Sequence, residues 1–185
     1  RKIFSIRHTD RIAYLRHFFF EGNCICHPTA LIRQTTLDNL GAFDVRYRRL
    51  VDLDYWIRLF ISHDVVVLDE ELAAHRFLDD ESNESGARTE VWAAARWEYT
   101  QILQHYRDID DTLFTEIFTD QIALLHLGGL DRIVQLGHIA VNASHISAQA
   151  FGLTLLHEAV TQHFSGITVD RVQHYASVLD IYGVT

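Results

Sequence analysis

The chain has 185 residues and a formal net charge of -9 at pH 7, so it can bury a hydrophobic core in one domain or two small ones. Its composition, 48% hydrophobic and 22% charged, is that of an ordinary globular protein. Because Lys2 is the single lysine, the acidic balance argues against a general nucleic-acid binder, whose phosphate contacts need clustered cations.

Two further features describe the environment that the sequence favours. No apolar run approaches the length of a membrane span and no signal peptide opens the chain, which favours a cytoplasmic protein. Cys24 and Cys26 have one residue between them in an expected strand, where they share a face but stand too far apart to bridge readily. We interpret them as reduced packing residues.

The first forty residues predict two short helices around an extended segment. Residues 11–20 predict a helix with a cluster of phenylalanines in the core, and residues 34–40 predict another, closed by Gly41, a common C-terminal signal. Residues 24–33 are rich in strand formers but contain Pro28, which cannot donate to a central ladder. We expect a bent or edge strand pair there.

Extended structure is also expected between residues 65 and 86. Val65, Val66, Val67 and Leu68 predict a short buried strand, and residues 70–77 a second extended piece. Residues 79–86 are polar throughout, which is typical of an exposed loop.

Residues 51–60 predict an amphipathic helix that starts with two carboxylates, Asp52 and Asp54. The apolar residues recur at helical spacing, and Asp52 falls where an N-cap belongs. The free backbone N–H groups and the positive end of the helix dipole then favour its ionised form, as a general base near neutral pH requires.

Each of these acidic residues also has a purely structural interpretation. An Asp that opens a helix is most often only a cap, which stabilises by roughly 1 kcal/mol. Asp54 and Arg58 are four residues apart, so their default is a surface ion pair that contributes about 0.3–0.5 kcal/mol. The basic cluster of residues 46–49 is by default a solvated loop, although it precedes Asp52 and could face an anionic acceptor or a donor diphosphate.

From residue 87 onward the sequence predicts one helix after another. Apolar stripes at helical spacing are Val91, Ala95, Tyr99, Ile102 and Tyr106; Leu113, Phe114, Ile117, Phe118, Ile122 and Leu125; Leu130, Ile133, Val134 and Val141; Leu153, Leu156, Val160 and Phe164; and Val172, Tyr175, Leu179 and Tyr182. Such segments cannot bury their faces singly, so we expect a helical bundle. Packing on the rest of the chain is its default role, with a dimer surface or partner docking as alternatives.

The 12 histidines do not form a metal-binding motif in the sequence. His157-Glu158 begins like the helix signature of zinc proteases, but Thr161 stands where the second His would be. We therefore expect no zinc site.

Four blocks of residues, in order along the chain, resemble the acceptor-side half of family 2 glycosyltransferases. The blocks are Asn23 to Arg33; Leu37 to Asp44, which contains Gly41-Ala42-Phe43-Asp44; Asp52-Leu53-Asp54-Tyr55-Trp56-Ile57-Arg58; and Leu72-Ala73-Ala74-His75-Arg76. The resemblance implies a GT-A fold and sugar transfer from a nucleotide donor with inversion at the anomeric carbon. It also implies that Asp52 is the catalytic base, which removes the proton from the acceptor hydroxyl.

The resemblance assigns roles to further positions. Asn23 and Arg33 would lie near the acceptor-site wall, Trp56 and Arg58 would support the base, and Arg76 would lie near the donor phosphates. In full, the positions implicated in acceptor or donor binding are Asn23, Arg33, Asp54, Trp56, Arg58 and Arg76.

The chain also departs from the family pattern. Val51 replaces the acidic residue before the base, His75 replaces a Tyr, and Leu78 stands where the family has a His that helps bind metal in some members. A competing interpretation makes Asp52-Leu53-Asp54 itself a metal-binding Asp-x-Asp, with oxygen ligands for a divalent cation. Such a motif normally follows a buried strand, whereas basic residues precede this one.

The nucleotide-binding half of the family finds no counterpart in the sequence. We therefore interpret the chain as a fragment that is inactive alone, from an enzyme that would use Mn or Mg, a nucleotide-sugar donor and a glycan or lipid-linked acceptor. The expected architecture is α/β over residues 1–86, a GT-A remnant with a few short strands, followed by an all-α helical domain over residues 87–185. The alternative is a non-catalytic interaction or oligomerisation module, including a homo-oligomer formed through the helical tail, on a degenerate glycosyltransferase scaffold.

Overall fold

Every regular element among the described residues is a helix, and none of these residues lies in a strand. The computed structural model describes residues 6–68, 70, 72, 89–162, 167–170 and 172–173. The chain divides into two compact units, residues 1–98 and 99–185, each treated separately below. The boundary expected between residues 86 and 87 lies outside the described residues.

The first unit is organised around α3 (Val51–Ser62), the predicted amphipathic helix. Seven of its side chains are buried: Leu53, Asp54, Tyr55, Trp56, Ile57, Leu59 and Phe60. Because the five consecutive positions 53–57 are all buried, neighbouring segments cover most of the circumference of α3 and not one face alone.

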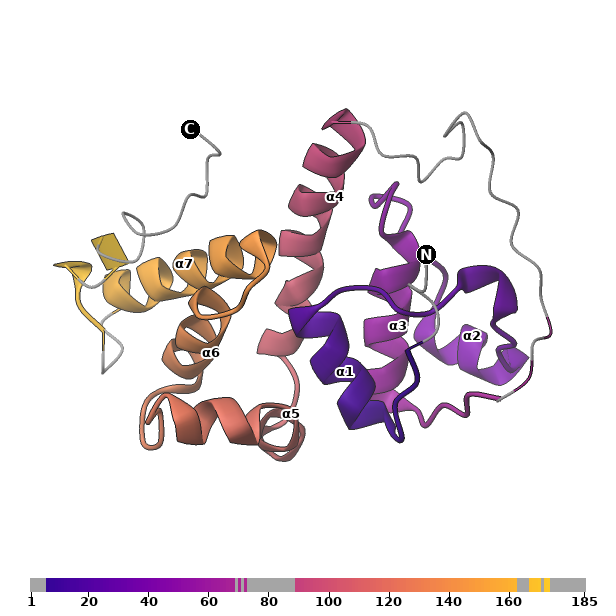
Figure 1. Cartoon of the computed structure of the whole chain (residues 1–185), viewed down its shortest axis with the longest axis horizontal. Helices are drawn as coiled ribbons and strands as arrows, with labels where there is room; N and C mark the ends of the chain where they lie inside the picture. Colours follow the sequence, from indigo (N-terminus) through magenta and orange to yellow (C-terminus); the bar gives the residue numbers. More distant parts are fainter. Residues whose placement is uncertain are drawn as a thin grey trace. The chain divides into compact units, whose positions relative to one another are not determined.

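Helix α1 (Arg11–Phe20) packs along α3, as Figure 1 shows. Tyr14 and Phe18 contact Phe60 with ring centroids 5.1 and 5.3 Å apart. Arg11 donates from its guanidinium to the carbonyls of Phe60 and Ile61, at 3.2 and 2.8 Å. A cation at the C-terminal end of α3 satisfies carbonyls that have no partner within the helix. The predicted helix over residues 11–20 is confirmed.

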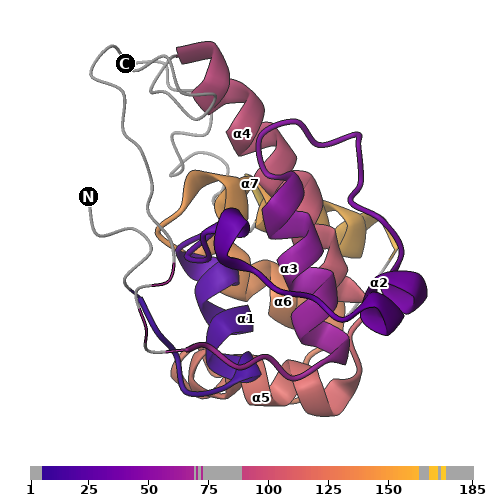
Figure 2. The same cartoon turned by 90° about the vertical axis from the view of Figure 1, so that its right-hand side faces the viewer.

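Helix α2 (Gln34–Leu40) ends at Gly41, as the sequence predicts. Gly41 has φ +81°, a left-handed conformation that glycine adopts without strain. After Gly41 the chain leads to α3. Both views show α2 beside α3 (Figures 1 and 2).

The predicted α/β architecture is wrong for the described residues. Residues 24–33 contain the 3₁₀ turn η1 (His27–Thr29), with Pro28 in its first turn, and no ladder. The expected buried strand over residues 65–68 is irregular, and Val66 is 83% exposed. A strand needs a partner to take its backbone N–H and C=O groups, and no described segment pairs with either stretch. Most of residues 70–77, and all of the expected loop 79–86, lie outside the described residues.

The second unit bears out the expected helical bundle. It contains the end of α4 (Thr89–Ile102), then η2 (Leu103–Arg107), α5 (Asp111–Leu124), α6 (Arg132–Val141) and α7 (Ile146–Thr161). Phe164, Tyr175, Leu179 and Tyr182 of the predicted stripes lie outside the described residues. None of the helices in the part of the chain that the structure describes combines the length and apolar character needed to span a bilayer.

Helices α6 and α7 pack closely against each other (Figure 1). A Cβ added to Gly152 would come within 2.7 Å of two backbone atoms of α6, the Gly137 oxygen and the Val141 nitrogen. The two helices therefore approach through glycines, and Val134, Val141, Leu156 and Ala159 fill the core around the crossing.

Candidate functional site

Asp52 lies in the first turn of α3, where two hydrogen bonds hold its carboxylate. The Asn23 amide Nδ2 donates to Asp52 Oδ2 at 2.7 Å, and the backbone N–H of Leu53 donates to Oδ1 at 2.9 Å. Asn23 is itself fixed, because its Oδ1 accepts the N–H of Ile25 at 2.9 Å. The structure thus brings together two of the predicted site residues, which are separated by 28 intervening positions in the sequence.

The expectation that Asp52 is the N-cap is wrong. The capping position is Leu50, which makes no side-chain cap bond, and Asp52 is the second residue of the helix. The expected electrostatic balance is also reversed. Burial raises the pKa of the Asp52 carboxyl above its usual value and outweighs the hydrogen bonds from Leu53 and Asn23 and the nearby His27, all of which lower it.

Cys26 and His27 are neighbours of Asp52 that the sequence analysis did not identify as site residues. Asp52 and burial together raise the pKa of the Cys26 thiol, with burial the larger cause. The ring of the exposed His27 lies 5.2 Å from that of Phe43 and 6.0 Å from that of Trp56. The sequence offered one signal for Cys26 and His27: both lie in the block that begins at Asn23, and Asn23 contacts Asp52.

Asp54 and Arg58 form an internal ion pair, so the expectation of a surface pair is wrong. Asp54 is 1% exposed, and the Arg58 guanidinium donates to its Oδ2 through Nε and Nη2, both at 2.9 Å. Arg58 also donates to the carbonyls of Leu40 and Ala42, each at 3.1 Å, where α2 ends. The pair therefore joins α3 to the end of α2 and supports the site from inside.

The remaining predicted site residues are less closely associated with Asp52. Trp56 is 2% exposed, and its buried Nε1 finds no hydrogen-bond partner among the described residues. Arg33 is exposed immediately before α2. Arg76, like the departures His75 and Leu78, lies outside the described residues.

Glu98, in α4, binds the backbone just before α3 and was not anticipated. Glu98 is 4% exposed. Its carboxylate accepts hydrogen bonds from the backbone N–H groups of Arg48, Arg49 and Leu50 at 2.9, 2.8 and 2.9 Å. Successive backbone N–H groups at a helix start form an anion-binding nest. Here the chain fills that nest with its own carboxylate. No local sequence signal links Glu98 to residues about fifty positions earlier.

The basic cluster before α3 is accordingly split between two roles. The backbone of Arg48 and Arg49 holds Glu98, while the side chain of Arg46 is 81% exposed and pairs with Asp44 at 2.6 Å. This pairing lowers the pKa of Asp44 to about 2. The solvated loop expected from the sequence is therefore correct for Arg46, whereas the loop backbone has a structural partner.

Asp52 and Asp54 do not fit a magnesium or manganese ion. Such ions prefer several carboxylate or carbonyl oxygens. In the Asp-x-Asp alternative both carboxylates would be ligands, yet Asp54 is buried against Arg58 and Asp52 is bonded to Asn23. The described residues do bring together three potential metal ligands, His8, His17 and Cys24, which would bind through nitrogen and sulfur atoms. Burial raises the pKa of the Cys24 thiol to about 11.

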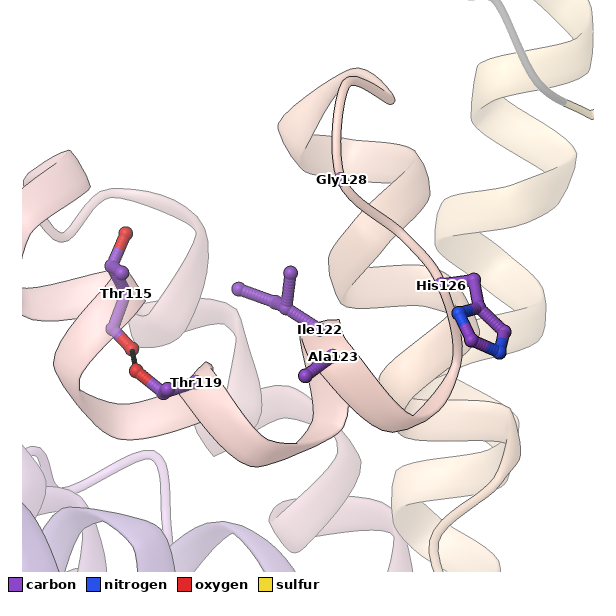
Figure 3. Close-up of a pocket in the computed structure, with 6 residues that line it drawn as sticks. All are labelled: Thr115, Thr119, Ile122, Ala123, His126 and Gly128. Carbon is purple, nitrogen blue, oxygen red and sulfur yellow. Dashed lines mark hydrogen bonds between the residues drawn. The ribbon is translucent and has the colours of Figure 1, made fainter.

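A depression of about 380 Å³ lies in the second unit, along α5 and the turn that follows it (Figure 3). Its mostly apolar lining is Thr115, Thr119, Ile122, Ala123, His126 and Gly128. The Thr119 hydroxyl is bonded to the Thr115 carbonyl, so it already has an acceptor within the helix. His126 is the one titratable lining residue, and a single titratable group does not make an acid–base or metal site.

Comparison of the chain with models of known protein families, with curated proteins and with solved structures found no match.

Proposed function

We propose that residues 6–62 carry the acceptor-side general base of an inverting glycosyltransferase, with Asp52 as that base. The carrying observation is the 2.7 Å hydrogen bond between Asn23 and Asp52, which joins two separate blocks of the sequence pattern. The proposal rests on this site and not on a GT-A sheet, since the described residues contain no strand.

The environment of Asp52 suits proton removal. Burial raises its pKa, which makes the ionised carboxylate a stronger base than an exposed one. Each carboxylate oxygen accepts one protein hydrogen bond, which leaves a further lone pair on each for an incoming hydroxyl.

The proposed reaction is a single displacement. The acceptor hydroxyl oxygen attacks the anomeric carbon, the bond from that carbon to the nucleoside diphosphate breaks, and the diphosphate leaves with the electron pair. The hydroxyl proton passes to Asp52 as the new glycosidic bond forms. Asn23 positions the carboxylate, and the Asp54–Arg58 pair fixes the helix that carries it.

The test measures nucleoside diphosphate release and sugar transfer by the full-length protein that contains this chain, using a panel of nucleotide sugars. Asp52→Asn should lower the rate at least about a hundredfold, within the range of general-base catalysis. Asp38→Asn is the matched control, because Asp38 is exposed on α2. Equal rates for Asp52→Asn and wild type would overturn the assignment.

A second candidate, the non-catalytic interaction module, is favoured by one surface feature. Trp92 and Trp97 on α4 are 53% and 62% exposed. Large aromatic side chains are enriched at protein interfaces. If this account is right, the protein self-associates in sedimentation experiments, Trp92→Ala with Trp97→Ala abolishes the association, and Asp52→Asn leaves it unchanged. A monomeric wild type would reject self-association through these two side chains.

A further inference from the structure

Three potential metal ligands meet beside α1, outside the proposed base site. His8 precedes α1, His17 lies within it, and Cys24 follows it. One ligand atom from each lies within 4.8 Å of the other two. The imidazole rings of His8 and His17 have centroids 4.9 Å apart.

One side chain of this cluster has a polar atom without a partner among the described residues. His8 Nε2 is buried, and no hydrogen-bond partner for it is present among the described residues. A buried polar nitrogen without a hydrogen-bond partner destabilises the fold. Cys24 is 3% exposed, so its sulfur is also withdrawn from water. A bound cation would supply the missing partner for His8 and a charge partner for the sulfur.

We propose that His8, His17 and Cys24 bind one Zn²⁺ ion. Two imidazoles and a thiolate are ligands that zinc prefers, whereas magnesium and manganese take oxygen ligands. The chain has no methionine, the usual axial ligand of copper sites with two histidines and a cysteine. Three protein ligands leave the fourth tetrahedral position for water.

The geometry requires only local closure. Zinc–nitrogen and zinc–sulfur bonds place neighbouring ligand atoms of a tetrahedral site about 3.3–3.6 Å apart. The present separations of up to 4.8 Å therefore shorten by about 1 Å on binding, which side-chain rotation in His8 and His17 can supply. As the zinc–sulfur bond forms, the Cys24 thiol releases its proton to solvent, and the ion and thiolate together carry one positive charge.

The site has a structural consequence for the neighbouring residue. Cys24 directly follows Asn23, which donates to Asp52. A zinc ion would tie this position to α1 and to the segment before it. The proposed zinc site is independent of the proposed function, and zinc binding to it is measured without any activity assay.

The experiment titrates the chelator-treated chain with Co²⁺ and then with Zn²⁺. We expect one equivalent of Co²⁺ to give a thiolate-to-cobalt charge-transfer band and the visible bands of tetrahedral cobalt, and Zn²⁺ to abolish both. Zinc should also raise the melting temperature of the wild-type chain.

Variants decide whether these three residues form the site. His8→Ala, His17→Ala and Cys24→Ser should each weaken zinc binding by more than the 10–100-fold typical of outer-sphere partners. Cys26→Ser and His157→Ala, the latter at an exposed histidine of α7, are matched controls that should bind like wild type. His8 lies outside the described helices, so His8→Ala removes no helical residue and decides the question even if Cys24→Ser does not fold. No cobalt charge-transfer band, or equal binding by His8→Ala and wild type, would overturn the proposal.

Discussion

Asn23 favours the ionised form of Asp52 through one short hydrogen bond, although burial, the N–H of Leu53 and His27 each affect the pKa of Asp52 more. Its amide donates to Asp52 Oδ2 and lowers the carboxyl pKa, against the larger effect of burial, which raises it. The bond stabilises the ionised form, so its removal favours the protonated form. We expect Asn23→Ala to raise the pKa of Asp52 further, as measured by NMR titration of a carbon-labelled carboxyl in this chain.

The same change should appear in the pH dependence of catalysis. A general base works only when ionised, so the acidic limb of the rate profile of the full-length protein should move to higher pH in Asn23→Ala. Asn39→Ala, at an exposed position of α2, is the control and should leave both titrations unchanged. A pKa of Asp52 that stays the same or falls in Asn23→Ala would mean that the amide does not stabilise the carboxylate.

At the scale of the element, the start of α3 depends on a carboxylate from a distant helix. Glu98 accepts three partly buried backbone hydrogen bonds, and its removal leaves these N–H groups without that acceptor. Each lost acceptor costs about 1–3 kcal/mol when the donor stays dry, and water entry reduces the total. We expect Glu98→Ala to lower the free energy of unfolding by at least about 2 kcal/mol in urea titrations, and Glu98→Gln to lower it less.

Glu116→Ala provides the comparison for Glu98, because Glu116 is exposed on α5. It should change the free energy of unfolding by no more than about 0.5 kcal/mol. A Glu98→Ala variant as stable as Glu116→Ala would show that the backbone before α3 does not need this carboxylate.

The close packing of α6 against α7 requires a residue without a side chain at position 152. A Cβ at Gly152 would lie 2.7 Å from backbone atoms of α6, so the helices must separate to admit it. This cost exceeds the gain in helix propensity, about 1 kcal/mol, that alanine brings over glycine. We expect Gly152→Ala to lower the melting temperature, and Gly128→Ala, where a Cβ meets nothing within 4 Å, to leave it nearly unchanged. A Gly152→Ala variant more stable than wild type would contradict the close approach.

At the scale of the whole molecule, the helices were predictable, whereas the strands predicted for the first unit are absent from the described residues. Helices α1 and α2 follow from local signals, the apolar spacing around Phe18 and the glycine at position 41. The extended segment around Pro28 has strand-forming residues, but a strand exists only if another segment pairs with it. Local pattern cannot specify that partner, and none is present among the described residues.

The candidate site divides in the same way. The sequence pattern identified Asp52 and Asn23, and the structure brings them into contact. The sequence pattern did not identify Glu98, because the contact between Glu98 and the backbone before α3 spans about fifty residues. It also did not identify the cluster of His8, His17 and Cys24, since their spacing of 9 and 7 residues matches no common metal motif and only the packing of α1 brings them together.

The measurement that tests the central claim most directly is sugar transfer by the full-length protein at saturating nucleotide sugar, with wild type, Asp52→Asn and Asp38→Asn compared side by side. The account predicts nucleoside diphosphate release by wild type and Asp38→Asn, and at least about a hundredfold lower rate for a folded Asp52→Asn. Turnover by Asp52→Asn at the wild-type rate, or no turnover by a well-folded wild type with any donor, would contradict it.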